Sequence, residues 1–144
     1  MAVAIKSQHE IELMREAGRI LALTHEELRK NLKPGMSTYD IDKIGEDFIR
    51  SHDCIPSFLN YHGYPASVCV SLNNEVVHGI PSKTRIIKEG DIVSLDAGVI
   101  YKGYHSDSAR THIVGEVSEE IKELVRVTRE SFFEGIKFAK EGYY

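Results

Sequence analysis

The chain has 144 residues, of which 42% are hydrophobic and 28% charged, and its formal net charge is -4. A chain of this length buries about 70% of its unfolded surface, which is enough for one hydrophobic core. The charge balance gives no basic stripe of the kind that binds nucleic acid. No apolar run approaches the ~20 residues that span a membrane. We therefore predict neither a nucleic acid nor a membrane as partner.

Cysteine usage and the first residues bear on the cellular compartment. Cys54 and Cys69 have neither CxxC spacing nor the density of a disulfide-rich domain. Residues 1–10 (MAVAIKSQHE) lack the apolar segment of a signal peptide. Together these features favour a cytoplasmic protein with reduced thiols.

The first expected element is a helix that begins after Ser7. The S-x-x-E pattern from Ser7 to Glu10 is a capping box, in which each end satisfies a free backbone N–H of the other. Pro34-Gly35 marks the end of the helical pattern. Apolar or small residues recur on one helical face at Ile11, Met14, Gly18, Leu21, Leu28 and Leu32.

A second helix is expected to begin at Ser37 or Thr38 and to end near His52. From residue 67 the pattern changes from helical to extended. Segments 67–72 and 76–77 are rich in β-branched residues and bracket the turn signal Asn73-Asn74. The buried face of the second helix is predicted to contain Ile41, Ile44 and Phe48.

Two longer extended segments follow, at 92–101 and 104–114, and they flank Lys102-Gly103. This spacing predicts an antiparallel hairpin. A third helix is expected from Ser118, with acidic residues in its first turn, and Gly142 is the expected stop. Its apolar face contains Ile121, Leu124, Val125, Thr128, Phe132 and Ile136.

Helices on either side of antiparallel hairpins predict an α+β fold. Neither an internal repeat nor a linker divides the chain, so residues 1–144 are interpreted as one unit.

Asp96 and Asp107 are the residues most indicative of function. Aspartate is rare in strands, and Asp96 interrupts a run that otherwise reads as buried. A tight turn of even length near residues 101–103 pairs residues whose numbers sum to an odd total. Asp96 and Asp107 sum to 203, so both are predicted on one face, directly opposite or diagonally offset. Two carboxylates this close repel each other unless a cation lies between them, and an aspartate on each strand could hold a pair of metals.

The spacing alone leaves another interpretation open, in which one aspartate caps a turn and the other forms a surface ion pair. His78 lies where a strand is expected to run into a Gly/Pro loop, a junction that often presents functional residues. Its imidazole could bind a metal, move a proton or bind a substrate. The alternative is a loop histidine that is satisfied by the backbone.

An apolar pocket is the remaining candidate feature. Closely spaced aromatic residues and a cysteine could line it, although they could equally belong to the core and its turns. These residues are Phe58, Tyr61, Tyr64 and Cys69. Arg110 is expected to pair with a carboxylate, and Lys83, Arg85 and Lys88 to form a solvated loop face. We interpret His62, His105 and His112 as structural or exposed.

The chain contains four linked motifs: YHGYP at 61–65, SLNNEVVHGIP at 71–81, EGDIVSLDAG at 89–98 and YHSDSART at 104–111. In this order they resemble the type I methionine aminopeptidases, specifically the bacterial form. The likeness extends to KSQHEIELMREAGRI and LKPGMSTYDID and so covers essentially the whole chain. Prolidase and aminopeptidase P share the fold, but HGIP together with YHGYP favours the methionine enzymes.

The resemblance implies the pita-bread (creatinase/aminopeptidase) fold, with its active site between two halves. It implies that Asp96 binds one divalent metal and that Asp107 bridges two. It also implies that His78 is a catalytic residue that binds the substrate amide. The metals (Co, Mn, Fe or Zn) would activate the water that releases methionine from nascent chains. Phe58, Tyr61, Tyr64 and Cys69 would form the methionine pocket, which suits a thioether.

The resemblance also implies five protein ligands for the metals, of which this chain supplies two. A histidine and two glutamates would lie beyond Tyr144. We therefore expect the N-terminal half of a catalytic domain, truncated and with little or no activity alone. The rival hypothesis is a non-catalytic half-domain that acts as a binding or dimerising module. A homodimer would bring two Asp96/Asp107 pairs together, and a prolidase-like specificity is a third possibility.

Overall fold

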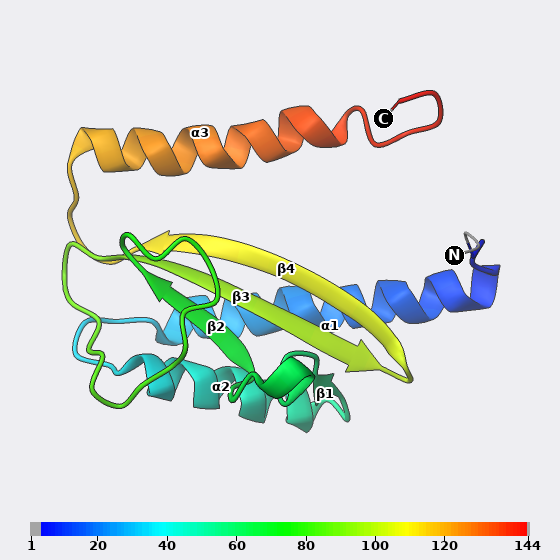
Figure 1. Cartoon of the computed structure of the whole chain (residues 1–144), viewed down its shortest axis with the longest axis horizontal. Helices are drawn as coiled ribbons and strands as arrows, with labels where there is room; N and C mark the ends of the chain where they lie inside the picture. The colour runs from blue at the N-terminus through cyan, green and yellow to red at the C-terminus, as the bar shows by residue number, and fades with distance from the viewer. Residues whose placement is uncertain (1–3, 144) are drawn as a thin grey trace.

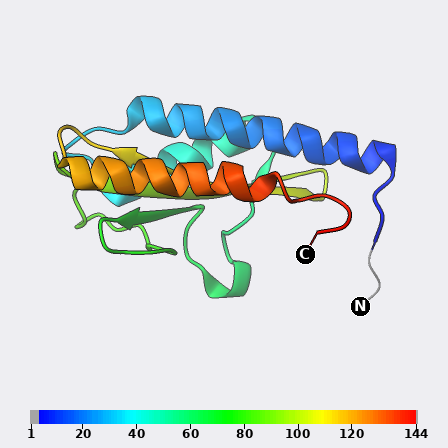
Figure 2. The ribbon, with the colours of Figure 1, turned by 90° about the horizontal axis from the view of Figure 1, so that it is seen from above.

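Two helices cover one face of a four-stranded antiparallel sheet, and a third helix stands apart from it (Figure 1). The computed structural model describes residues 4–143. Seen from above, the first and third helices both run along the length of the molecule (Figure 2). The elements are α1 Gln8–Asn31, α2 Thr38–Ser51, β1 Ile55–Pro56, a 3-10 helix Tyr61–Gly63, β2 Val68–Leu72, β3 Ile92–Tyr101, β4 Tyr104–Ile113 and α3 Glu119–Ile136.

All three predicted helix starts are confirmed, and at α3 the Ser118 side chain accepts from the Ile121 N–H. At α1, the Ser7 side chain accepts from the Glu10 N–H, and the Glu10 carboxylate accepts from the Ser7 N–H at 2.7 Å. At α2, Ser37 and Asp40 form the same reciprocal pair. Each capping box satisfies two backbone donors that the helix itself leaves free.

The buried face of α1 differs from the predicted one. Ile11 and Met14 are each 39% exposed, because the N-terminal end of α1 extends past the end of the β3–β4 hairpin (Figure 1). Only the later turns of the helix lie over the sheet. The buried residues there are Ala17, Ile20, Leu21, Thr24, His25 and Leu28. On α2, Ile41 is buried as predicted, whereas Ile44 and Phe48 are only half-buried and Ile49 takes the buried place.

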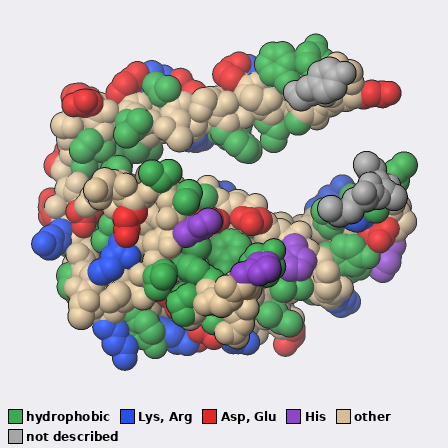
Figure 3. Space-filling model, viewed as in Figure 1, with side chains coloured by type: hydrophobic (Ala, Val, Ile, Leu, Met, Phe, Trp, Pro, Cys, Tyr) green, Lys and Arg blue, Asp and Glu red, His purple; other side chains and the backbone are tan. Residues whose placement is uncertain are grey.

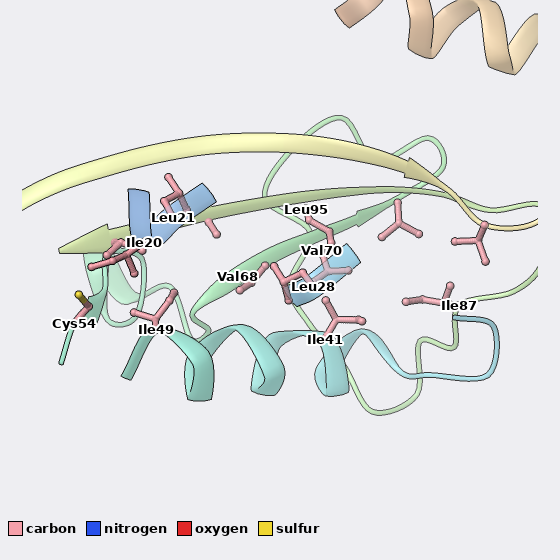
Figure 4. Close-up of a cluster of buried hydrophobic side chains, with 14 residues drawn as sticks. Ile20, Leu21, Leu28, Ile41, Ile49, Cys54, Val68, Val70, Ile87 and Leu95 are labelled. Carbon is pink, nitrogen blue, oxygen red and sulfur yellow. The ribbon is translucent and has the colours of Figure 1, made fainter. Parts of the chain in front are cut away.

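The core lies between these two helices and the sheet (Figure 4). Alternate residues of β3 point into it, as the two-residue period of a strand requires. Helix α1 packs against β3 and β4, while α2 packs against β2 and α1. The β3 residues in the core are Val93, Leu95, Ala97 and Val99.

Strand β3 is the centre of the sheet. Strand β4 pairs with one side of it, and β2 and β1 pair with successive parts of the other side, all antiparallel. The hairpin register pairs Tyr101 with Tyr104, so the turn has two residues. Lys102 and Gly103 both have positive φ, at 47° and 85°, as in the type I′ turn that matches strand twist.

Two predictions about elements are wrong, and one short strand was missed. Residues 76–77 do not form a strand, and Val76 and Val77 are 88% and 63% exposed. Helix α3 ends at Ile136, six positions before Gly142, and contains no buried residue. Its predicted apolar face is therefore uncovered. The short strand β1, which pairs with Val99 and Ile100, was not predicted.

Among residues 4–143, every helix is too short or too polar to cross a membrane.

Two histidines lie beneath β4 on the helix-covered side. The His25 Nε2 atom lies 3.0 Å from the carbonyl oxygen of Ser108. Because a carbonyl oxygen only accepts, Nε2 carries the proton and donates. Burial lowers the pKa of His25 and of His112 below the usual 6.5. The interpretation of His112 as structural agrees with this partly buried place, and His62 and His105 are exposed.

This pair predicts a loss of stability in mild acid. Below pH 6.5 the two histidines bind protons in the unfolded chain but remain neutral in the folded one, because their folded pKa is lower. Their contribution to stability is therefore complete above pH 6.5 and is lost as the pH falls toward the lowered folded pKa. The slope is at most about 1.4 kcal/mol per pH unit for each histidine. Urea unfolding between pH 7.5 and 5 measures it.

The matched variant is His25→Gln with His112→Leu, in which Gln keeps the donor to Ser108. Asp96 acts in the opposite direction, since its pKa is raised to about 6 and its protonation stabilises the fold as the pH falls toward 3.8. The histidine contribution is therefore the difference between wild type and variant. Parallel pH curves for the two proteins would contradict the prediction.

Candidate functional site

Asp96 and Asp107 share the sheet face that α1 and α2 leave uncovered. In the hairpin register, Asp96 pairs with Ala109 and Asp107 pairs with Gly98. The two aspartates are therefore diagonal neighbours, which in sheets lie about 7–8 Å apart. The prediction that they share a face is confirmed, in its diagonally offset form. On the same face, the hydroxyls of Ser94 and Thr111 lie 2.8 Å apart.

The electrostatics of Asp96 are unfavourable without a partner. Its Oδ1 atom is buried and has no hydrogen-bond partner among the described residues. Burial, followed by the charge of Asp107, raises the pKa of Asp96 from 3.8 to about 6. A buried polar atom left unpaired is costly. A cation would satisfy Oδ1 and offset the repulsion from Asp107.

The donor set fits part of a divalent metal site. Carboxylate oxygens are hard ligands, which suit ions such as Mn²⁺ or Mg²⁺. Within residues 4–143, however, no group of three or more His, Cys, Asp or Glu side chains is close enough to hold a metal ion. The aspartate pair therefore supplies two carboxylates, and other ligands are needed to complete the shell.

His78 lies in an exposed loop beside this pair. Its backbone is left-handed, with φ of 58°. A charged His78 would lower the pKa of Asp96, against the larger effects of burial and Asp107. The structure therefore brings His78 near Asp96, although from a loop rather than from the predicted strand end.

Three of the four predicted pocket residues gather around the aspartates. Cys69 on β2 pairs with Asp96 across the sheet and is buried. Phe58 lies against Gly98, where an added Cβ would come within 3.0 Å of its ring. The Tyr64 hydroxyl donates to the Gly79 carbonyl at 3.1 Å. Tyr61 differs, because it is 66% exposed and packs edge-on against His62.

The thiol of Cys69 remains protonated in this environment. Burial is the main cause that raises the pKa of Cys69, and the nearby carboxylates act in the same direction. Because metals bind the thiolate form, the structure favours Cys69 as a wall residue over Cys69 as a ligand.

The positively charged residues lie outside this cluster. Arg110 pairs with a carboxylate as predicted, namely that of Glu26 on the helix side of the sheet at 3.7 Å. Both side chains are exposed, so this pair contributes little to stability. Arg85 pairs with Glu75, and Lys83 lies over the Tyr39 ring. A cavity of about 400 Å³ is also remote from the aspartates, because it lies between the ends of α1 and β4.

Sequence reasoning missed Asp42, which fixes the start of β2. Its Oδ1 atom accepts from the N–H groups of Ser67 and Val68, both at 2.8 Å. Asp42, Gly45 and Ile49 share the buried face of α2. A carboxylate at that position of a helical stripe is the signal that could have revealed it, because a buried charge needs partners.

The face that carries this site is partly apolar. In the space-filling view, histidine side chains lie beside hydrophobic ones in the middle of the molecule (Figure 3). Hydrophobic side chains also gather along α3, on the side that faces the rest of the molecule (Figure 3). Both surfaces are open in the described chain.

Comparisons with known proteins agree on one family. The sequence profile of metallopeptidase family M24 matches residues 12–144. The chain is 52% identical over 140 residues to a methionine aminopeptidase of Clostridium acetobutylicum, which covers 97% of this chain and 56% of the relative. It is 51% identical over 140 residues to methionine aminopeptidase 1 of Bacillus subtilis, with the same two shares. The chain thus spans about half the length of these curated relatives.

A solved structure supports the same fold. The methionine aminopeptidase of Rickettsia prowazekii superposes with a TM-score of 0.91 at 37% identity, over 94% of this chain and 54% of that one. The predicted mixed fold, part of a pita-bread architecture, is confirmed. The roles assigned to individual site residues stay predictions.

The electrostatics of the aspartate pair predict the effect of Asp107→Asn. Removing the Asp107 charge should lower the pKa of Asp96 below about 6 but keep it above 3.8, because burial, the largest cause of the rise, remains. Carboxyl ¹³C NMR titration of the metal-free chain measures this change. Asp47→Asn, on the exposed face of α2, is the matched control. An unchanged Asp96 pKa in Asp107→Asn would show that the carboxylates do not interact.

Proposed function

The chain belongs to metallopeptidase family M24, and we propose that it provides the metal-binding aspartates and part of the substrate pocket of a methionine aminopeptidase. The observation that carries this proposal is the buried, unpaired Oδ1 of Asp96 beside Asp107 on the open sheet face. A charged oxygen in such a place needs a cation, and peptidases of this family use divalent metals.

In this proposal Asp96 would hold one divalent ion and Asp107 would bridge two, which could be cobalt, manganese, iron or zinc. When bound, such ions polarise the substrate carbonyl and lower the pKa of water. The shell would be completed by ligands that residues 4–143 do not contribute, since those residues bring no third ligand together.

The other residues of the cluster would bind and orient the peptide. His78 would donate a hydrogen bond to the first amide of the substrate from its place in the exposed loop. Phe58, Tyr64 and Cys69 would contact the methionine side chain, and a flexible thioether suits aromatic and sulfur neighbours. Tyr61 would join them only if it moved from its exposed position.

The proposed substrate is the free N-terminus of a nascent chain that begins with methionine and a small residue. The relatives at 51–52% identity are named methionine aminopeptidases, which favours methionine release over the prolidase-like specificity. Such a substrate would be met in the cytoplasm.

A second candidate function is a half-domain that dimerises. The observations that favour it are the uncovered apolar side chains of α3, among them Leu124 and Phe132, and the open sheet face with its incomplete metal site. Large exposed apolar surfaces commonly mark interfaces. A second copy that covers both surfaces would bring two Asp96/Asp107 pairs together.

Complementation tests the proposed activity. The chain is co-expressed with the C-terminal part of the Clostridium acetobutylicum relative that the alignment leaves uncovered, and methionine release from a Met-Gly peptide is measured with Mn²⁺ or Co²⁺. We expect release by the combined protein and little or none by the chain alone. Asp96→Asn should lower the rate at least about 100-fold, because a metal ligand is lost.

Asp47→Asn is the control, because it removes a carboxylate from the exposed face of α2. Release that is unaffected by Asp96→Asn would contradict the proposed metal role. Cleavage of Xaa-Pro peptides in preference to Met-Gly would show the prolidase-like specificity instead.

Light scattering coupled to size-exclusion chromatography tests the dimer. The dimer proposal predicts that the wild-type chain has twice the mass of one copy. The double variant Leu124→Glu/Phe132→Glu should have the mass of one copy, because both substitutions place charge on the apolar face of α3. Lys137→Glu is the control, because it adds the same charge just past the end of α3 rather than on its apolar face. A wild-type chain that elutes with the mass of one copy at all concentrations excludes the dimer.

A further inference from the structure

The loop that carries His78 leaves the sheet after β2 and returns to it at Gly79. Residues 73–78 bridge this interval, and Asn73 and His78 at its two ends have positive φ of 53° and 58°. Left-handed backbone is unfavourable for residues with a side chain. Contacts at the end of the loop must therefore hold His78 in this conformation.

Those contacts converge on Gly79, which is buried although His78 is exposed. The Gly79 N–H donates to the Ser71 hydroxyl at 3.0 Å. The Gly79 carbonyl accepts from the Val70 N–H at 2.9 Å and from the Tyr64 hydroxyl at 3.1 Å. Both backbone groups of the residue after His78 are thus bound by residues from two other parts of the chain.

Steric contact allows only glycine at this point. A Cβ on Gly79 would overlap with the carbonyl oxygen of Val70 and lie 2.8 Å from the Cα of Ser71. The chain therefore presses directly against β2 here. The next backbone unit toward the loop belongs to His78, so any movement of Gly79 moves His78.

Tyr64 connects this anchor with the predicted methionine pocket. Its hydroxyl lies 3.1 Å from the Gly79 carbonyl and 3.4 Å from the Val68 carbonyl. Burial raises the pKa of Tyr64 well above its ordinary value, so the hydroxyl keeps its proton and remains a donor. Val68 directly precedes the pocket residue Cys69.

We propose that Ser71 and Tyr64 are positioning residues that hold His78 beside the aspartate pair by binding the two backbone groups of Gly79. Tyr64 has two roles in this proposal, because its ring belongs to the pocket while its hydroxyl restrains the backbone next to His78. This inference rests on the proposed function for the role of His78 toward substrate. The restraint itself is a property of the metal-free chain.

Amide hydrogen exchange of the metal-free chain tests the restraint. Ser71→Ala removes the acceptor of the Gly79 N–H, and Tyr64→Phe keeps the ring but removes the donor to its carbonyl. We expect exchange at Gly79 to become roughly tenfold faster in each variant, as for the loss of one net hydrogen bond. Ser71→Thr, which keeps a hydroxyl, should restore protection. Unchanged exchange at Leu95 and Ala97 in β3 reports an intact fold.

Kinetics of the complemented protein test the consequence for His78. Tyr64→Phe should lower kcat about tenfold with less than a twofold change in KM, because the pocket ring remains while His78 loses its restraint. Tyr64→Ala should also raise KM, because the ring is lost. A change in KM alone for Tyr64→Phe would show that Tyr64 is only a pocket wall and would overturn the proposal.

The two arms separate the possible failures. Unchanged exchange at Gly79 in both Ser71→Ala and Tyr64→Phe overturns the restraint, whatever the activity. If no form of the wild-type protein releases methionine, the proposed function fails, while the exchange arm still decides whether Ser71 and Tyr64 hold the loop.

Discussion

The register of β3 against β4 determines where every candidate functional group lies. The two-residue turn at Lys102-Gly103 pairs Tyr101 with Tyr104, and this pairing places Asp96 and Asp107 on one face. A slip of one residue would exchange the two faces of a strand. The core opposes such a slip, because Val93, Leu95 and Val99 are fully buried and each contributes about 1.5–3 kcal/mol. The rise in the pKa of Asp96 from 3.8 to about 6 corresponds to at most about 3 kcal/mol, and to less after screening, since this carboxylate is half exposed. Core burial therefore outweighs the cost of charging Asp96 beside Asp107 and keeps the two carboxylates on one face.

The two faces of the sheet differ in what they contribute. The face under α1 and α2 supplies stability, and Asp42 extends that support by holding the start of β2, next to Cys69. The opposite face contains features that are unfavourable for stability, among them an unpaired carboxylate oxygen at Asp96 and a left-handed backbone at His78. Perturbed pKa values and backbone strain tend to gather at functional sites. Here both occur among residues for which the sequence resemblance predicts metal and peptide binding.

Much of this arrangement follows from local patterns in the sequence. The S-x-x-E pattern at Ser7 predicts the start of α1, and the parity of a tight turn predicts that Asp96 and Asp107 share a face. Patterns fail where the outcome depends on what lies beside a segment. Val76 and Val77 have strand-forming side chains, but the Val70 N–H is bound by the Gly79 carbonyl, so the intervening residues form a loop with nothing to pair against. Ile11 fits the apolar stripe of α1 but is 39% exposed, because the N-terminal end of α1 extends past the β3–β4 hairpin. The contact between Tyr64 and Gly79 joins positions 15 residues apart through a side chain, and no periodicity encodes it.

Anomalous X-ray scattering from crystals of the chain soaked with Mn²⁺ would test the metal assignment most directly. A divalent ion should give an anomalous difference peak between the carboxylates of Asp96 and Asp107, with Oδ1 of Asp96 among its ligands, and the peak should disappear in Asp96→Asn. Manganese bound only at other surface carboxylates, with the Asp96/Asp107 pair empty at the same concentration, would contradict the assignment of this sheet face as the metal site.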